Sequence, residues 1–174
     1  MRFPQTHRFL VAVFVLGLAF GGFATAHAGN LHRVPRDYAT IQEAVDAADP
    51  GDTISIQPGA YSEAVSIDKD ITLTGDGPRE AVALSSAAGG LPAITLHDTE
   101  ATVTSFAVSG DDAHVRVEGG APLIKDVAFA AAQPPDVGHP LTFAMLAIAG
   151  GSRAQVVDND FAGAGILSVD VLLG

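Results

Sequence analysis

Residues 40–77 hold the feature that most limits how this chain can fold. They contain a short helix signal followed by three brief strand signals, each ended by a turn. The segment reads TIQEAVDAADPGDTISIQPGAYSEAVSIDKDITLTGDG. A change from a helical period to an alternating period within so few residues indicates one short helix that leads into a series of short strands. Strands of this length need neighbours, which the rest of the chain must supply.

The helix signal begins with a capping box. Thr40 precedes Glu43 by three residues, so the Thr hydroxyl and the Glu carboxylate can satisfy free backbone amides at a helix start. We therefore expect a helix that begins at Ile41 and ends before Pro50-Gly51. Its apolar residues share one face, which can rest on an apolar surface: Ile41, Ala44, Val45 and Ala48.

The three strand signals alternate apolar and polar residues. The apolar pairs are Ile54 with Ile56, Val65 with Ile67, and Ile71 with Leu73, and turns follow at residues 58–59, 68–70 and 75–78. Two inward apolar residues bury too little surface to offset the entropy lost when a strand is ordered. Successive strands must therefore stack as coils that share a core. The helix would then cover one end of the stack and protect its unpaired strand edges.

This order of elements resembles the first coils of the pectin lyase-like superfamily. It is most similar to the start shared by pectin methylesterases and bacterial carbohydrate-binding β-helix proteins. The resemblance is carried by Thr40, Ile41, Gln42, Ala44, Pro58, Gly59, Tyr61, Glu63, Val65, Ile67, Lys69, Ile71, Leu73 and Gly75. It implies an all-β, right-handed, single-stranded parallel β-helix with a short N-terminal capping helix. It implies no single function, because the same opening precedes esterases, lyases, hydrolases and non-catalytic carbohydrate-binding repeats.

Residues 1–28 have the layout of a cleaved secretory signal, in which basic residues precede an apolar run over residues 9–20 and small residues end at Ala28. The alternative is a transmembrane anchor. Glycines interrupt the apolar run, however, and it is short for a span of about 20 apolar residues. We therefore expect cleavage after Ala28, a secreted or periplasmic protein, and one β-helix domain over residues 29–174. The chain has no cysteine, so this domain must be stable without disulfides.

The strand pattern continues beyond Gly77 with looser spacing. Apolar residues recur at Val82 with Leu84, Ile94 with Leu96, Val103 with Phe106 and Val108, and Val115 with Val117. Residues 119–129 and 150–161 repeat one another, with Ile124, Asp126 and Phe129 matched by Val156, Asp158 and Phe161. A repeat of about 30 residues is typical of solenoid coils, so we expect about five to seven coils.

The end of the chain indicates a longer parent structure. Residues 169–173 form an apolar run with no polar cap after them, and residues 133–140, with three prolines, would form a projecting loop. The expected number of coils is small for an enzyme of this superfamily. We therefore expect a β-helix truncated at its C-terminus, whose open last coil associates with other chains.

The chain is strongly acidic. Its net charge is −11, and loss of Arg2 and Arg8 with the signal would make the mature protein more acidic still. Such a charge opposes binding to nucleic acid and to anionic membrane surfaces, so neither is an expected partner. It also favours neutral or esterified polysaccharides over bare polyanionic ones. A local basic patch, if one exists, would lie around Arg116, Lys125 and Arg153.

We do not find in this sequence the catalytic residue sets that the enzymes of the resembled family would require. Resemblance to pectin methylesterases would require two aspartates on neighbouring coils, one in a G-x-x-D-F context, and an arginine in an R-P-W context, and the chain has no tryptophan. Residues 81–84, AVAL, match a short motif of that family but come a full coil too early, so we interpret them as an ordinary strand. Lyases of the superfamily would require a calcium-binding carboxylate cluster and a basic arginine.

The best carboxylate cluster is Asp158-Asn159-Asp160. Calcium needs several oxygens that converge on one point, whereas neighbouring residues of a strand point to opposite sides. Only Asp158 and Asp160 would then share a face. We interpret Asp158 and Asn159 as a coil corner held by side-chain to backbone hydrogen bonds, and Asp111-Asp112 as a solvated turn. We therefore assign no catalytic, cofactor-binding or metal-binding residue and expect no cofactor.

The histidines and one tyrosine also have ordinary explanations. His32, His97, His114 and His139 lack the spacing of metal ligands, and we expect them at exposed turns or strand edges. Tyr61 has the chemistry to stack on a sugar ring, but its ordinary role after Pro58-Gly59 is to cover the corner of a coil.

Two classes of function remain. The first is a secreted, non-catalytic module that binds carbohydrate on the face of its parallel sheet. The second is an enzyme acting on pectin-like polysaccharide, a pectinesterase or a polysaccharide lyase, whose catalytic coils are missing from this chain. The missing residue sets favour the first class. A weaker third class is assembly, in which stacking through the open end builds a longer structure.

Overall fold

The computed structural model describes residues 29–86, 91–110, 114–131, 144–162 and 166–168. These residues form mainly short β-strands. The helical segments are α1 (Ile41–Ala47) and the 3-10 turn η1 (Arg79–Ala81). The strands are β1 (Leu31–Val34), β2 (Thr53–Ile56), β3 (Gly59–Ser62), β4 (Val65–Ile67), β5 (Thr72–Gly75), β6 (Val82–Ser85), β7 (Ile94–His97), β8 (Thr102–Gly110), β9 (Val115–Glu118), β10 (Leu123–Ala131), β11 (Ala144–Ile148), β12 (Gln155–Val157), β13 (Asp160–Ala162) and β14 (Ile166–Ser168).

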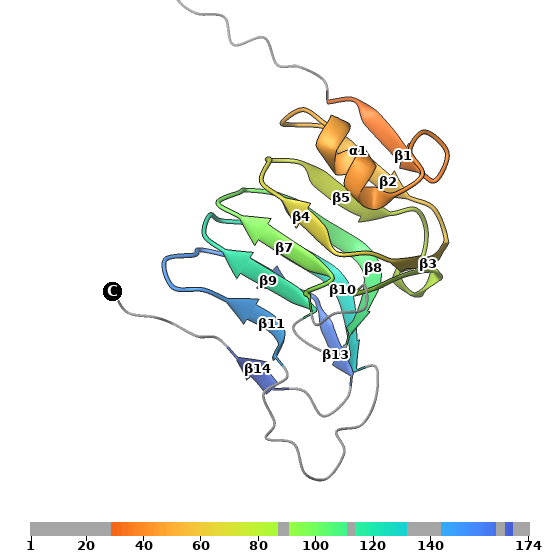
Figure 1. Cartoon of the computed structure of the whole chain (residues 1–174). Helices are drawn as coiled ribbons and strands as arrows, with labels where there is room; N and C mark the ends of the chain where they lie inside the picture. Colours follow the sequence, from red (N-terminus) through yellow and green to blue (C-terminus); the bar gives the residue numbers. More distant parts are fainter. Residues whose placement is uncertain (1–28, 87–90, 111–113, 132–143, 163–165, 169–174) are drawn as a thin grey trace, which may run out of the picture.

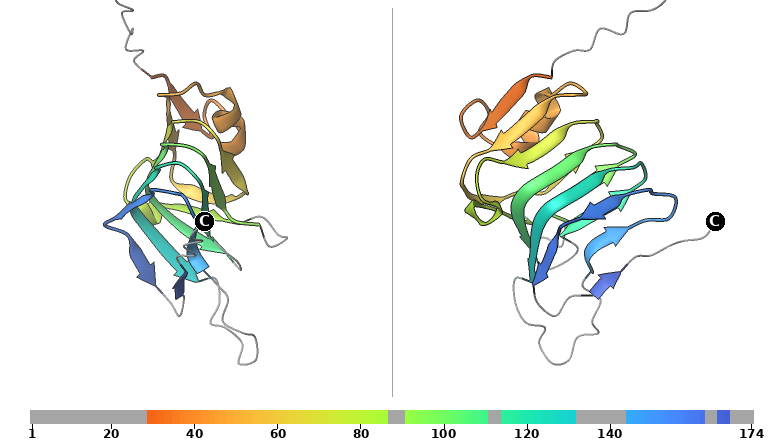
Figure 2. Two further views of the ribbon diagram at one scale, coloured as in Figure 1. Left: turned by 90° about the vertical axis from the view of Figure 1, so that its left-hand side faces the viewer. Right: turned by 180° about the vertical axis from the view of Figure 1, so that it is seen from behind.

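The strands belong to two sheets that the chain visits in turn (Figure 1). The nine-stranded sheet has the order β1-β2-β5-β8-β10-β12, with β3, β6 and β13 paired beside this path, and the five-stranded sheet has the order β14-β11-β9-β7-β4. Each winding crosses both sheets and pairs in parallel with the winding before it. Figure 2 shows these windings stacked from the helical end to the far end. The prediction of an all-β parallel solenoid is therefore confirmed.

The interior is filled by columns of apolar side chains. In the nine-stranded sheet one column runs through Ile54, Leu73, Val103 and Ile124. The facing column of the five-stranded sheet runs through Val65, Ile94, Val115 and Leu146. All of these side chains are buried. The short strands are stable because each coil adds its few apolar residues to a core that all coils share.

The repeat between residues 119–129 and 150–161 corresponds to two neighbouring coils. Ile124 pairs in register with Val156 on β12, and Phe129 pairs with Phe161 on β13. The two phenylalanine rings are stacked, with centroids 4.6 Å apart and planes inclined by 7°. The sequence repeat therefore specifies the strand register.

Helix α1 covers the first end of the stack, as predicted, and packs against β1, β2 and β4 (Figure 1). The Thr40 hydroxyl accepts from the Glu43 amide at 3.1 Å, and the Glu43 carboxylate accepts from the Thr40 amide at 3.3 Å, which completes the capping box. The Glu63 carboxylate accepts from the amides of Ile41 and Gln42. At the other end, the Lys69 ammonium donates to the carbonyls of Val45, Asp46 and Ala48 at 3.1, 2.9 and 3.0 Å. Charges of opposite sign thus lie at the two ends of the helix dipole.

The side chain of Gln42 closes the edge of the five-stranded sheet. Its Oε1 accepts from the Ser66 amide at 2.8 Å, and its Nε2 donates to the Ser66 carbonyl at 3.3 Å. Ser66 lies on β4, the last strand of that sheet. A side-chain amide thus takes the place of a neighbouring strand, which leaves this edge less open to other chains.

Several strands were not predicted from the sequence. Strand β1 pairs with β2, β3 pairs with β6 in a stretch interpreted as a turn at Pro58-Gly59, and β11 pairs with β9. Strand β3 is mostly exposed, so it lacks the alternating burial that marks a strand in sequence. Its pairing follows from the stacking of the coils.

Several predictions concern residues outside the described ranges. These are the signal over residues 1–28, the Asp111-Asp112 turn, the loop over residues 133–140 with His139, and the apolar run over residues 169–173. Among the described residues, no helix is long and apolar enough to span a membrane.

Candidate functional site

The site lies at a corner of the nine-stranded sheet, where three successive coils bend sharply. Ser105, Asp126 and Asp158 occupy this corner with φ angles of 64°, 52° and 55°. Left-handed backbone is uncommon for residues with a side chain, and aspartate is among those that tolerate it best. Gly75 lies on β5 beside Ser105, and a Cβ atom there would collide with the Ser105 carbonyl oxygen. The close stacking of the corner therefore requires glycine at this position of the motif.

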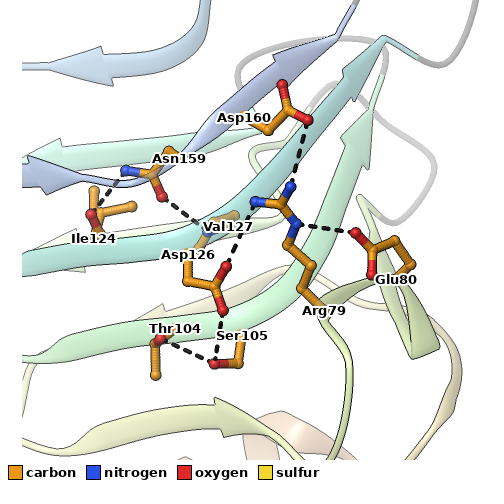
Figure 3. A network of polar contacts seen from close by, with 9 residues as sticks. All are labelled: Arg79, Glu80, Thr104, Ser105, Ile124, Asp126, Val127, Asn159 and Asp160. Carbon is orange, nitrogen blue, oxygen red and sulfur yellow. Dashed lines mark hydrogen bonds and ion pairs between the residues drawn. The ribbon is translucent and has the colours of Figure 1, made fainter.

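Arg79 connects three carboxylates around this corner. It projects from η1 and donates from Nε to Glu80 at 3.0 Å, from Nη1 to Asp126 at 3.5 Å and from Nη2 to Asp160 at 3.5 Å. Figure 3 shows the guanidinium between these side chains. The arginine side chain is 25% exposed, whereas those of Asp126 and Asp160 are 45% and 61% exposed. The carboxylates thus remain open to solvent while the arginine holds them.

The charges in this cluster support one another. The hydrogen bond to Glu80 is the largest cause that raises the pKa of Arg79 above its ordinary value. The same hydrogen bond from Arg79 lowers the pKa of Glu80. Arg79 and Glu80 thus each stabilise the charged form of the other.

Two hydroxyl groups extend the cluster along the sheet. The Ser105 hydroxyl donates to Asp126 Oδ2 at 3.3 Å, and it lies 3.1 Å from the Thr104 hydroxyl. Figure 3 shows Thr104, Ser105 and Asp126 as a connected path to Arg79. We refer to Arg79, Glu80, Ser105, Asp126 and Asp160 as the polar corner.

Asn159 holds the corner together, as the sequence predicted. Its Oδ1 accepts from the Val127 amide and its Nδ2 donates to the Ile124 carbonyl, both at 2.9 Å. The expectation that Asp158 and Asp160 share a strand face was wrong, because β12 ends at Val157 and β13 begins at Asp160. Strand alternation does not apply across the bend between them. Asp160 instead points toward Arg79 (Figure 3).

The polar corner combines an arginine with two aspartates on adjacent strands, since Ala128 of β10 pairs with Asp160 of β13. The sequence search for such a set relied on family contexts and missed it. The repeat aligns Asp126 with Asp158, which lies two residues before Asp160, so it marked the coil that carries the second acid. Nothing in the sequence around Arg79 indicated its role, because its partners lie 47 and 81 residues away.

His32 was wrongly predicted to be an exposed turn or edge residue. It lies on β1, where its Nε2 donates to Asp52 Oδ2 at 2.8 Å and its Nδ1 lies 3.1 Å from the Tyr38 hydroxyl. The His32 side chain is only 13% exposed. Asp52 is buried and also accepts from the amides of Asn30 and Asp49. The hydrogen bond from His32 is the largest of the causes that hold the Asp52 pKa far below its ordinary value.

The other described histidines divide between the interior and the surface. His114 is buried, contrary to the prediction, and its Nε2 lies 2.9 Å from the Ala130 carbonyl oxygen. His97 is 43% exposed at the end of β7, as predicted, and its Nδ1 lies 3.1 Å from Glu118 of β9. Arg116 lies 3.7 Å from the same carboxylate. His97, Arg116 and Glu118 therefore form a smaller polar cluster on the five-stranded sheet.

The remaining candidates do not form a site. Tyr61 is partly buried against the core and donates its hydroxyl to the Gln57 carbonyl at 2.9 Å, which fits its ordinary structural role. Arg116 and Lys125 lie on β9 and β10, in different sheets, and Arg153 lies in the turn before β12. Within the described ranges, no group of three or more acidic or histidine side chains is arranged to hold a metal ion.

In comparisons with known proteins, no family model, no curated protein and no solved structure matches this chain. The resemblance to the pectin lyase-like superfamily therefore stays a prediction from its motif. Most polar residues of that motif serve the fold, since Thr40, Gln42, Glu63 and Lys69 hold the capping helix.

Proposed function

We propose that this chain is a secreted or periplasmic module that binds carbohydrate without catalysing a reaction. Its scaffold is, in this proposal, a right-handed parallel β-helix of the pectin lyase-like type. The handedness follows from the strong preference of parallel strand crossovers for the right-handed path. The proposed location follows from the signal layout of residues 1–28.

The polar corner is the observation that carries this proposal. Sugars present neighbouring hydroxyl groups, each of which donates and accepts hydrogen bonds. The exposed carboxylates of Asp126 and Asp160 supply acceptors, and the Arg79 guanidinium, whose five N–H groups exceed its three bonds to carboxylates, supplies donors. Hydrogen bonds that involve charged groups are stronger than neutral ones, and these groups are already oriented by one another. The cluster can therefore bind hydroxyl-rich ligands with little reorganisation.

The second candidate function is an enzyme acting on pectin-like polysaccharide. One observation favours it: two aspartates on adjacent strands share one arginine, which is the combination that resemblance to pectin methylesterases would require. The contexts of these residues differ from the family motifs, and the chain has no tryptophan. The non-catalytic module therefore remains the preferred proposal.

Binding measurements on a panel of polysaccharides test the preferred proposal. The Arg79→Gln variant should bind the best neutral or heavily esterified glycan at least about tenfold more weakly, because two carboxylates lose their charged partner. The matched control is Arg36→Gln, which removes the same charge from a side chain that is 68% exposed. Equal binding by the Arg79→Gln variant and the wild type would contradict the proposal.

The same panel tests the expected charge preference. Polygalacturonate should bind more weakly than esterified pectin, since the protein is strongly acidic. If polygalacturonate does bind, a divalent cation must bridge the carboxylates, and a chelator should abolish the binding. Tight binding that resists the chelator would contradict this charge argument.

Activity assays separate the two candidate functions. We expect no methanol release from methylated pectin and no unsaturated uronide above a blank without protein. If either product is formed, and is lost in Asp126→Asn and Asp160→Asn variants that remain folded, the enzymatic alternative replaces the binding module.

A further inference from the structure

The residues just before β1 pack tightly against the turn that precedes β2. A Cβ atom on Gly29 would collide with the Gly51 carbonyl oxygen and would lie only 3.0 Å from the Cα atom of Asp52. The Asn30 carbonyl accepts from the Thr53 amide at 2.9 Å, directly ahead of the pairing between β1 and β2. Gly29 therefore has a fixed place on the first coil, where any side chain would force the backbone to shift.

A buried carboxylate lies beside this place. Asp52 is buried, and its Oδ1 accepts from the Asn30 amide at 2.6 Å. Its Oδ2 accepts from the Asp49 amide at 2.9 Å and from His32 Nε2 at 2.8 Å. No lysine or arginine in the described ranges forms an ion pair with this carboxylate. Buried carboxylates are usually paired with a positive charge, so this one has room for a further cationic partner.

The backbone nitrogen of Gly29 lies close to this carboxylate. Three covalent bonds connect it to the Asn30 nitrogen, which is 2.6 Å from Asp52 Oδ1. The lengths of these bonds place the Gly29 nitrogen no more than about 7 Å from Oδ1. Opposite charges attract considerably at this range where water is largely excluded.

Cleavage after Ala28 would change the charge of this nitrogen. In the uncleaved chain it is a neutral amide, because it belongs to the peptide bond with Ala28. In the cleaved chain it is an α-amino group, whose ordinary pKa of about 7.7–8.0 keeps it mostly protonated at neutral pH. Removal of the signal therefore creates a cation beside a buried acid.

We propose that the α-ammonium group freed at Gly29 binds the Asp52 carboxylate, so that removal of the signal completes the first coil and fastens the capping helix. This inference goes beyond the proposed function and rests only on the expected cleavage after Ala28. Asp52 already joins β1 to the segment that follows α1, through His32 and the Asp49 amide. A charged partner strengthens a contact that holds both elements.

The proposal makes the first coil of the mature protein more stable than that of its precursor. Helix α1 has only 7 residues and depends on this coil for its own stability. The exact start of the chain also matters. One extra residue, Ala28, would leave a neutral amide at Gly29 and would move the charge about 3.5 Å along the chain.

Selective acetylation of the α-amino group of the exported protein tests the inference. Acetylation removes the charge and should lower the thermal unfolding temperature by about 3 °C or more. In the Asp52→Asn variant, which has no buried charge to pair, the same acetylation should have little effect. The matched control is a protein that retains Ala28, because it carries the same ammonium one residue farther away. It should unfold at a lower temperature than the protein that starts at Gly29.

A second measurement does not depend on the folding of any variant. In the wild type, NMR titration of the Gly29 Cα resonance should give an α-amino pKa above the ordinary value of about 8, because a nearby carboxylate stabilises the protonated form. An ordinary pKa would overturn the proposal. So would equal effects of acetylation in the wild type and in Asp52→Asn, or an exported protein whose sequence starts elsewhere than at Gly29. None of these results bears on carbohydrate binding, so the proposed function stands or falls separately.

Discussion

At the scale of single residues, the recognisable motif and the candidate site are largely different sets. The motif residues Gln42, Glu63 and Lys69 hold α1 against the first coil. Arg79, at the centre of the candidate site, lies just beyond the motif segment. This separation explains why the resemblance indicates a fold more strongly than an activity.

Asp52 is the residue whose loss should most affect the first coil. Its carboxylate is buried and joins β1, the end of α1 and the start of β2 through His32 and two backbone amides. The Asp52→Asn variant should therefore unfold at a clearly lower temperature at neutral pH, because an amide replaces the charged acceptor. Thermal unfolding followed by circular dichroism measures this change.

The pH dependence of this effect has a definite sign. Interactions in the folded state lower the pKa of Asp52, so its stabilising contribution is present above the unfolded pKa of about 3.9 and is lost as the pH falls below that value. The difference between wild type and Asp52→Asn should be similar at about pH 7 and about pH 5, and should shrink below about pH 4. The control Asp76→Asn changes an exposed turn residue. A difference that grows toward acid pH would contradict the assignment.

At the scale of elements, α1 depends on its surroundings for stability. It has 7 residues, whereas isolated helices shorter than about 12–15 residues are marginal in water. Side chains from the first coil therefore stabilise both ends of α1. Glu63 binds the N-terminal end of the helix, and Lys69 binds the C-terminal end. The cap and the first coil should form together.

The Lys69→Met variant tests this dependence. Methionine keeps an apolar stem but leaves three carbonyl groups of the helix end without their donor. We expect a loss of about 1–3 kcal/mol in the free energy of unfolding, measured by urea denaturation. The control Lys125→Met removes an exposed ammonium from the outer face of β10 and should have little effect. Equal stability of Lys69→Met and the wild type would show that the helix end needs no cap.

At the scale of the whole molecule, the two ends of the solenoid differ. The first end is covered by α1, whereas the last described coil exposes Val156, Val157 and Phe161 by 39%, 41% and 39%. Strands β12 and β13 pair only with β10, so their outer edges have no partner among the described strands. Exposed strand edges with apolar residues recruit other chains.

We therefore expect concentration-dependent self-association through the last coil, measured by light scattering. A Val156→Lys variant should reduce it, because a charge on an open strand edge opposes pairing. Leu91→Lys is the control, since Leu91 is 56% exposed at a distance along the chain from the last coil. A wild type that stays monomeric at high concentration would show that this end is closed.

The whole molecule should also begin near Gly29 after export. The signal layout predicts that residues 1–28 are removed. N-terminal sequencing of the exported protein should therefore begin at or within a few residues of Gly29. An intact chain that starts at Met1 and is extracted only with detergent would contradict cleavage.

The sequence by itself determined the elements that depend on local physics. The capping box at Thr40 specified the start of α1, and the alternation at Ile54 and Ile56 specified β2, because helix and strand periods are properties of neighbouring residues. The repeat of Ile124 and Phe129 at Val156 and Phe161 specified the register of two coils. Each of these signals lies within one coil or between adjacent coils.

Only the tertiary structure decided which distant residues meet. Arg79 contacts Asp160, which lies 81 residues later, and His32 contacts Asp52, which lies 20 residues later. These distances depend on the lengths of the turns between strands, which vary from coil to coil and carry no periodic signal. The polar corner and the buried His32–Asp52 pair therefore arise from stacking, because stacking alone brings side chains of separate coils within hydrogen-bonding distance.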